Sequence, residues 1–278
     1  GMYFDGLRLQ RLVKIGGYKL SIRAVLRVIF SNYFMAMLTP GASGGAVAQV
    51  LVLRSYGVPI SKGTPIVLIR TVFSIMFLVI MLPLVFLRDA IEIPYISRDM
   101  LLIFAVLAVI ATLVGTYILQ TKYMRQFVYN LAQRFKAHNT KDWLSKLETL
   151  NQGLGLLYKQ PVQSVIVFIE SGLSLLCLYC IAPALMYAFT PDIPIIDILD
   201  RMILLNLILY FAPTPGGTGI AEGLFVVLFS AFVPNGTVGI IAVGWRVVAE
   251  YMPFFIGMYA VLTLYGRQFV AQETSREQ

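Results

Sequence analysis

Histidine and charged side chains are scarce in this sequence, and their scarcity limits the chemistry that it can carry. Charged residues make up 13% of the 278 residues, whereas a soluble domain has about a quarter. The single histidine, His138, lies in a polar and basic stretch. One histidine without a second cysteine pair excludes a histidine-based metal site. We therefore expect neither a bound metal nor another cofactor.

Two further common features are missing, namely paired cysteine ligands and a secretory signal peptide. Cys177 and Cys180 form a lone C-x-x-C inside an apolar run, without the loop or the partner ligands of a zinc or redox motif. We predict that both thiols pack between helices. Residues 1–20 have no apolar core followed by a cleavage site, so they are not a signal peptide.

Apolar residues, in contrast, are abundant. They make up 58% of the chain, and the mean hydropathy is +0.79. This predicts a multi-pass protein of the cell membrane. The net charge of +8 does not indicate nucleic acid, because the basic residues lie beside apolar runs, where they set topology and meet anionic headgroups. One basic group predicts a cytoplasmic N-terminal segment: Arg8, Arg11, Lys14, Lys19, Arg23 and Arg27.

Four apolar runs are long enough to cross a bilayer, which takes about 20 helical residues. They are residues 64–87, 100–120, 161–189 and 237–265. The loops 88–99 and 190–200 between them are acidic, while residues 121–160 are basic and have the leucine and aromatic spacing of an amphipathic helix pair on the membrane surface. By the positive-inside rule, the basic segments are cytoplasmic and the acidic loops lie outside.

Two other apolar regions are interrupted by proline and glycine. Residues 38–45 read LTPGASGG, and residues 212–223 read APTPGGTGIAEG. Regular helix does not continue through such sequences, and each break has half-length apolar runs on both sides. We therefore predict two re-entrant hairpins that enter the membrane from opposite faces. Interrupted backbone at membrane depth requires surrounding protein or a water-filled cavity, and it is typical of transport sites.

The two breaks have matching neighbours. Asn32 precedes Pro40 by eight residues, and Asn206 precedes Pro215 by nine. Arg70 follows the first of these prolines by thirty residues, and Arg246 follows the second by thirty-one. This indicates an inverted repeat, with chance similarity of two glycine-rich turns as the alternative.

The predicted fold is therefore an all-α integral membrane protein, an inverted repeat with two opposed re-entrant hairpins and about four full transmembrane helices. It forms one domain over residues 1–278: unit one (22–87), a span (100–120), a cytoplasmic amphipathic segment (121–160) and unit two (161–265). Two full spans precede the second break and none precedes the first. Symmetry thus predicts that the chain lacks two N-terminal helices of a longer protein, with residues 2–5 as the stub of the second.

Ionisable residues inside the apolar runs are functional candidates, because each costs about 2.5–3.5 kcal/mol at a helix centre. Arg246 and Glu250 are four residues apart and can pair, either as a structural ion pair or in contact with substrate. Glu222 follows the second break and complements the positive end of a helix. Glu170 has no obvious partner, so proton transfer, ion coupling and a hydrogen bond to a hairpin all stay open.

Arg70 and Arg246 suit recognition of one phosphate headgroup, since arginine binds phosphate bidentately. Glycine amides at the helix starts would favour the same anion, although the glycines also suit close helix packing. We predict no catalytic residue and no metal ligand. The candidate substrate-binding residues are Asn32, Pro40, Gly41, Gly44, Gly45, Arg70, Glu170, Asn206, Pro215, Gly216, Gly217, Gly219, Glu222, Arg246 and Glu250.

These motifs, together with Tyr251-x-Pro253, resemble the lysylphosphatidylglycerol synthase transmembrane-region family, which is also described as flippase-like. The resemblance covers nearly the whole chain. It implies movement between leaflets of a phospholipid, such as an aminoacylated phosphatidylglycerol, or of a polyisoprenyl-phosphate-linked lipid. The chain departs from the family in having no aminoacyltransferase domain after Tyr265, so lysyl transfer is not expected. Family members usually begin with two further membrane helices before the position of Arg8, which agrees with the two N-terminal helices that symmetry predicts to be missing.

Other functions fit parts of the same pattern. An ion-coupled transporter of a small anionic solute would use the same hairpins. An enzyme of lipid-linked glycosyl transfer would need a carboxylate site, for which residues 121–160 offer only Asp142 and Glu148. A partner subunit of a lipid-modifying synthase or transferase would bind through that segment. The expected partners are membrane lipids with an anionic or phosphate-bearing headgroup, a second copy of the chain in an oligomer, and no nucleic acid.

Overall fold

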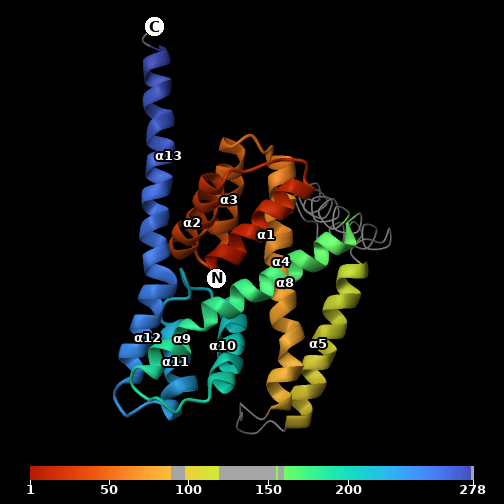
Figure 1. Cartoon of the computed structure of the whole chain (residues 1–278), viewed down its shortest axis with the longest axis vertical. Helices are drawn as coiled ribbons and strands as arrows, with labels where there is room; N and C mark the ends of the chain where they lie inside the picture. The colour runs from red at the N-terminus through yellow and green to blue at the C-terminus, as the bar shows by residue number, and fades with distance from the viewer. Residues whose placement is uncertain (89–97, 119–154, 156–159, 277–278) are drawn as a thin grey trace, which may run out of the picture.

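The computed structural model describes residues 1–88, 98–118, 155 and 160–276, and every regular element in these residues is a helix (Figure 1). This confirms the predicted all-α class. The first half contains α1 (Met2–Ile15), α2 (Ile22–Leu38), α3 (Ser43–Ser55), α4 (Ile60–Leu87) and α5 (Arg98–Ile118). The second half contains α8 (Pro161–Tyr179), α9 (Ile181–Tyr187), α10 (Ile195–Leu209), α11 (Ile220–Phe229), α12 (Val238–Arg246) and α13 (Met252–Arg276).

Three of the described helical segments are long and apolar enough to cross a membrane. They are Ile60–Leu87, Pro161–Tyr187 and Val238–Leu264, and they agree with three of the four predicted spans. The fourth prediction falls on α5, which packs beside α4 (Figure 1). The described apolar part of α5, Asp99–Thr112, is shorter, so a full crossing there stays a prediction.

Large apolar side chains cover the outside of the helices. On α5, Ile103, Phe104 and Leu107 are 57–73% exposed, and on the final helix Phe255 and Tyr259 are 60–70% exposed. A soluble protein would bury such side chains, whereas lipid tails solvate them at no cost. The described surface is therefore that of an integral membrane protein.

Both breaks lie between short helices. Residues 39–42 separate α2 from α3, which pack against each other, and residues 210–219 separate α10 from α11. These helices have 17, 13, 15 and 10 residues, so three of them are too short to cross a bilayer alone. The boundary of the acidic loop 190–200 was wrong, because α10 begins at Ile195. Pro194 is the N-cap residue before that helix, and Asp197 in its first turn complements its positive end.

The basic N-terminal segment, for which we predicted only a cytoplasmic location, begins with a helix that packs into the protein. Residues Met2–Ile15 form α1, which packs against α2, α4 and α8. Its apolar residues Leu9, Leu12 and Val13 repeat at helical spacing and are buried. The same face buries Arg8, because Asp5 on the same helix compensates its charge and Ser74 of α4 accepts another of its hydrogen bonds.

Two predicted spans contain irregular backbone. A π-helical turn, Val247–Tyr251, joins α12 to α13, and α13 rises past α2 beyond the other helices (Figure 1). The other span is divided at Cys180 into α8 and α9. Cys177 and Cys180 are both exposed, so the prediction that they pack between helices was wrong. Cys177 lies on α8 and Cys180 at its junction with α9, and lipid is the expected neighbour of both.

Some predictions fall outside the described residues. Most of the amphipathic segment 121–160, including His138, Asp142 and Glu148, lies there, as does most of the loop 88–99.

Candidate substrate site between the two hairpin tips

The two proline-glycine breaks, far apart in sequence, meet in space. Pro40 and Pro215 form an isolated antiparallel bridge. Beside it, Gly216 has a φ of +58°, and a Cβ at that position would lie 2.5 Å from the Sδ of Met37. The positive φ favours glycine there, and the missing side chain also lets tip two lie against Met37 of α2. We refer to residues 39–42 and 210–219 as tip one and tip two.

A second close approach holds the first hairpin together. A Cβ on Gly45 of α3 would overlap the side-chain oxygen of Asn32 on α2 and would lie 3.0 Å from the backbone oxygen of Asn32. Small residues at helix crossings allow backbones this near each other. In this place, the packing role of the glycines is confirmed.

A cavity of about 410 Å³ lies between the two tips. Its wall combines tip one, tip two and side chains of α1, α2, α3, α4, α8 and α10, so both halves of the chain build it. This volume falls in the usual range for small-ligand sites, which is about 300–1,000 Å³. The candidate residues that line it are Asn32, Gly41, Arg70, Asn206, Gly216, Gly217 and Glu250.

On one side of the cavity, two arginines share one carboxylate. Asp5 accepts from Nε of Arg8 at 2.6 Å and from Nε of Arg70 at 3.0 Å, and its second oxygen pairs with Nη2 of Arg70. All three residues are at most 6% exposed and line the cavity. We call them the Asp5 cluster, and its formal charge is +1.

Polar side chains connect the Asp5 cluster to the first hairpin. Arg70 donates to Gln49 of α3 at 2.6 Å, and Gln49 donates to Asn32 of α2 at 2.6 Å. Arg8 also donates to Ser74 of α4 at 2.8 Å. The buried charges are therefore hydrogen-bonded to residues of α1, α3 and α4, and Gln49 extends the network to α2, as low-dielectric surroundings require.

Beside tip two the charge balance is reversed. Arg246 donates to Glu222 through Nε at 2.8 Å and to the carbonyl oxygen of Gly216 through Nη2 at 2.8 Å. Its Nη1 lies 3.6 Å from Glu250, which confirms that this i,i+4 pair can form. We call Glu222, Arg246 and Glu250 the Glu222 cluster, and its formal charge is −1.

The two predicted phosphate ligands lie in different surroundings. Arg70 is among the described residues that line the cavity, whereas Arg246 is not, and Arg246 is only 1% exposed. The structure instead places Arg8 beside Arg70 at the cavity wall. A phosphate in the cavity would therefore face Arg8 and Arg70, and the acid of the other half that lines it is Glu250.

The backbone amides at the helix starts are partly occupied. The amide of Gly219 donates to Glu222 at 2.6 Å, which confirms that this carboxylate caps α11. The amide of Gly44 donates to Oγ1 of Thr39 at 2.8 Å. At these two positions the expectation of free amides for an anion was wrong, because the chain supplies its own acceptors.

Two other candidates lie elsewhere or differ from their expected partner. Glu170 pairs with Arg11 at 2.7 Å and is not among the described residues that line the cavity. Its partner was missed because α1 was not predicted. Asn206 donates to the backbone oxygen of Met202, whereas Asn32 accepts from Gln49. The two asparagines thus occupy matching positions in sequence but make different contacts.

Sequence reasoning missed Asp5 and Gln49, and it assigned Arg8 to topology alone. One signal was available, and it concerns Asp5 and Arg8. Asp5 and Arg8 are three residues apart, directly before the helical pattern Leu9, Leu12 and Val13. That spacing predicts an ion pair on a helix. Gln49, in contrast, has a neutral side chain in an apolar run, and only its contact with Arg70 reveals its role.

Comparison with known proteins bears on this arrangement. A family model described as the lysylphosphatidylglycerol synthase TM region matches residues 1–257. The chain belongs to this family. The match includes both tips, the Asp5 cluster and the Glu222 cluster, and it confirms the resemblance inferred from the motifs.

A search of curated proteins also finds a relative. A UPF0104 membrane protein of Archaeoglobus fulgidus is 22% identical over 268 residues, which cover 92% of this chain and 80% of that protein. No solved structure matches the chain. Membership of the lysylphosphatidylglycerol synthase TM region family thus rests on sequence, and the geometry described above supplies the positions of its polar residues.

Proposed function

We propose that this protein is a flippase-like transporter of the cell membrane, which moves a phosphate-bearing lipid between leaflets by holding its headgroup in the cavity between the two tips. The observation that carries this proposal is the Asp5 cluster, in which Arg8 and Arg70 line the cavity and share a single carboxylate. An anionic headgroup would supply the negative charge that this cluster lacks. An aminoacylated phospholipid and a polyisoprenyl-phosphate-linked lipid both carry such a phosphate.

The arrangement of the hairpins supports a transport mechanism. We propose that the two units are inverted in the membrane, with the first hairpin entering from the cytoplasm and the second from outside. Their tips would then meet near the bilayer midplane at the Pro40–Pro215 bridge. Rocking of one unit against the other would expose the cavity to each leaflet in turn.

A transport assay with a matched pair of variants tests this proposal. Ala46 lines the cavity, while the next residue of α3, Val47, is 58% exposed on the outside. Ala46→Trp should fill the cavity, and Val47→Trp should leave it open. The purified protein would be reconstituted in liposomes that contain a fluorescent phosphatidylglycerol, and bleaching of the outer leaflet would report movement across the bilayer.

We expect wild-type protein and Val47→Trp to move the lipid faster than protein-free liposomes do, and Ala46→Trp to fall to the protein-free rate. The same assay would be repeated with a fluorescent polyisoprenyl-phosphate-linked lipid. Failure of wild-type protein to move either lipid faster than protein-free liposomes do would contradict the proposal. So would full activity of Ala46→Trp, because the headgroup would then pass elsewhere.

The cavity volume favours one alternative function. At about 410 Å³ it would also enclose a small anionic solute. Uptake of a radiolabelled organic phosphate into the same liposomes, blocked by Ala46→Trp and accompanied by no lipid movement, would select this alternative over lipid transport.

A further inference from the structure

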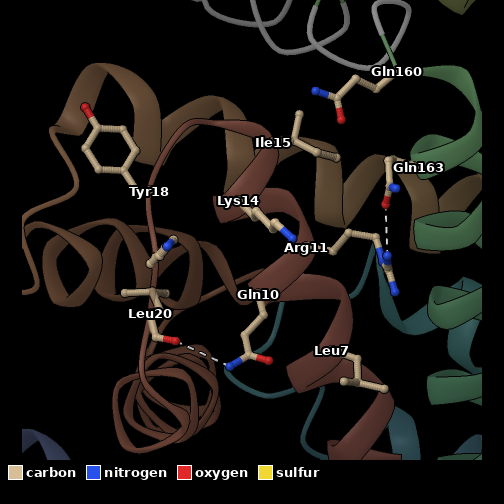
Figure 2. Close-up of a pocket in the computed structure, with 10 residues that line it drawn as sticks. Leu7, Gln10, Arg11, Lys14, Ile15, Tyr18, Leu20, Gln160 and Gln163 are labelled. Atoms are coloured by element: carbon tan, nitrogen blue, oxygen red, sulfur yellow. Dashed lines mark hydrogen bonds between the residues drawn. The ribbon is translucent and has the colours of Figure 1, made fainter.

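A second cavity lies at the other end of α1, where this helix ends and α8 begins (Figure 2). Its volume is about 540 Å³, and it is lined by the last turns of α1, the loop that follows, and Gln160 and Gln163. Among the described residues, it shares no lining residue with the cavity between the tips. It is therefore a separate site.

One turn of α1 divides the two cavities. Arg8 lines the cavity between the tips, and Arg11, three residues later, lines this second one. Arg11 reaches across to α8, where Nη1 donates to Gln163 at 2.8 Å (Figure 2) and Nη2 donates to Glu170 at 2.7 Å. Glu170 thus fixes Arg11 in the wall and neutralises its charge.

The remaining charges in this wall are positive. Lys14 and Lys19 line the cavity, are exposed, and form no ion pair with any residue in the described part of the chain. The neutral polar groups are three glutamine amides and the hydroxyl of Tyr18. Gln10 donates a hydrogen bond to the backbone oxygen of Leu20 at 3.4 Å (Figure 2). Leu7, Ile15 and Leu20 add apolar surface. The cavity thus combines two ammonium groups, which no acid among the described residues neutralises, with amide donors and an apolar wall.

We propose that this second cavity binds a phosphate group, that of an anionic phospholipid at the membrane surface. Ammonium groups attract phosphate, amides donate to its oxygens, and the apolar wall suits the glycerol and the first methylenes of a lipid. Basic pockets between membrane helices bind such headgroups in general. This proposal does not rest on the transport function, because the site shares no residue with the proposed transport cavity.

The test is a titration of the full chain in an uncharged maltoside detergent, read as the shift in unfolding temperature. Four soluble probes are used: dihexanoyl phosphatidic acid, dihexanoyl phosphatidylglycerol, dihexanoyl phosphatidylcholine and inorganic phosphate. The variant Lys14→Gln/Lys19→Gln removes both ammonium groups. Lys62→Gln is the matched control, since Lys62 is exposed in the first turn of α4 and does not line this cavity. The part of each shift that depends on Lys14 and Lys19 reports this site.

We expect the two anionic lipids to stabilise wild-type protein and Lys62→Gln alike. In the double variant the affinity of this site for the anionic lipids should be about 30-fold lower, as expected for the loss of two ammonium groups at about 1 kcal/mol each. Stabilisation by inorganic phosphate, equally dependent on the lysines, would support the phosphate site and assign it to free phosphate. Equal binding in the double variant would overturn the proposal, and so would an equally lysine-dependent shift with the zwitterionic phosphatidylcholine.

Discussion

The Asp5 cluster and the Glu222 cluster occupy comparable places, each with an arginine on the helix that follows a hairpin. Arg70 is bonded to the first hairpin through Gln49, and Arg246 is bonded to the second through Glu222. Their charges are opposite, since two arginines share one carboxylate in the first cluster and one arginine lies between two carboxylates in the second. The two clusters thus occupy matching positions after the two breaks but differ in what they offer a ligand.

The clusters also differ in burial. All members of the Asp5 cluster are at most 6% exposed. In the Glu222 cluster the arginine is 1% exposed, but the side chains of both acids are 28–29% exposed. The two arginines of the Asp5 cluster have one carboxylate between them, so its loss leaves both without an ion pair. Arg246 has two carboxylates, so it keeps one when the other is neutralised. This difference predicts how each acid responds to neutralisation.

Asp5→Asn should have the largest effect, because it leaves two buried arginines without their carboxylate. Breaking a buried pair costs about 3–5 kcal/mol. We expect a loss of that size in the free energy of unfolding, measured by SDS titration in mixed micelles. The control is Asp192→Asn, at an exposed acid in the loop before α10, which should change little. If Asp5→Asn were as stable as Asp192→Asn, the Asp5 cluster would not depend on its single carboxylate.

The second-largest effect on stability should come from a glycine substitution in the first hairpin, whereas a glycine substitution in the second should be tolerated. Gly45→Ala places a methyl group onto Asn32, which bonds to Gln49, so we expect a loss of about 1–3 kcal/mol from overpacking. Gly223→Ala in α11 meets no described atom within 4 Å, and alanine favours helix. The same titration should show that this second variant is as stable as wild type or more so. A tolerated Gly45→Ala would mean that α2 and α3 separate easily.

Glu222→Gln should have an intermediate effect. The variant weakens the cap on Gly219 and the closest charged contact of Arg246, but the arginine keeps Glu250 and the carbonyl oxygen of Gly216. We expect a loss of about 1–2 kcal/mol in the free energy of unfolding, since the carboxylate is partly exposed. A loss as large as that of Asp5→Asn would show that Glu250 does not compensate the charge of Arg246 in the variant.

Glu250→Gln should have the smallest effect on stability, under about 1 kcal/mol, since Glu222 holds Arg246 at shorter distance. Because Glu250 lines the cavity, the variant should nevertheless change lipid preference. In the liposome assay we expect faster movement of phosphatidylglycerol relative to an amine-bearing phospholipid. An unchanged ratio of the two rates would contradict a role for this acid in the cavity.

Much of this picture could be predicted from sequence, because lipid and backbone chemistry impose strong patterns. Three of the spans are continuous apolar runs, and the clusters of proline and glycine within residues 38–45 and 212–223 predict the breaks in helix that the structure contains at residues 39–42 and 210–219. The i,i+4 spacing of Arg246 and Glu250 predicts a pair that the structure contains. The cap by Glu222 follows equally from its place in the first turn of α11.

The residue composition of the cavity was decided by tertiary structure. Asp5 lies 65 residues from Arg70, and Arg11 lies 159 residues from Glu170, so no local pattern connects them. The sequence by itself determined a membrane protein with two broken hairpins and matching arginines. Only packing decided that α1 lies among the other helices, because a buried charge requires a partner and the nearest one came from a distant segment. That packing gave Arg70 an acid and a second arginine, and so made the two halves unequal.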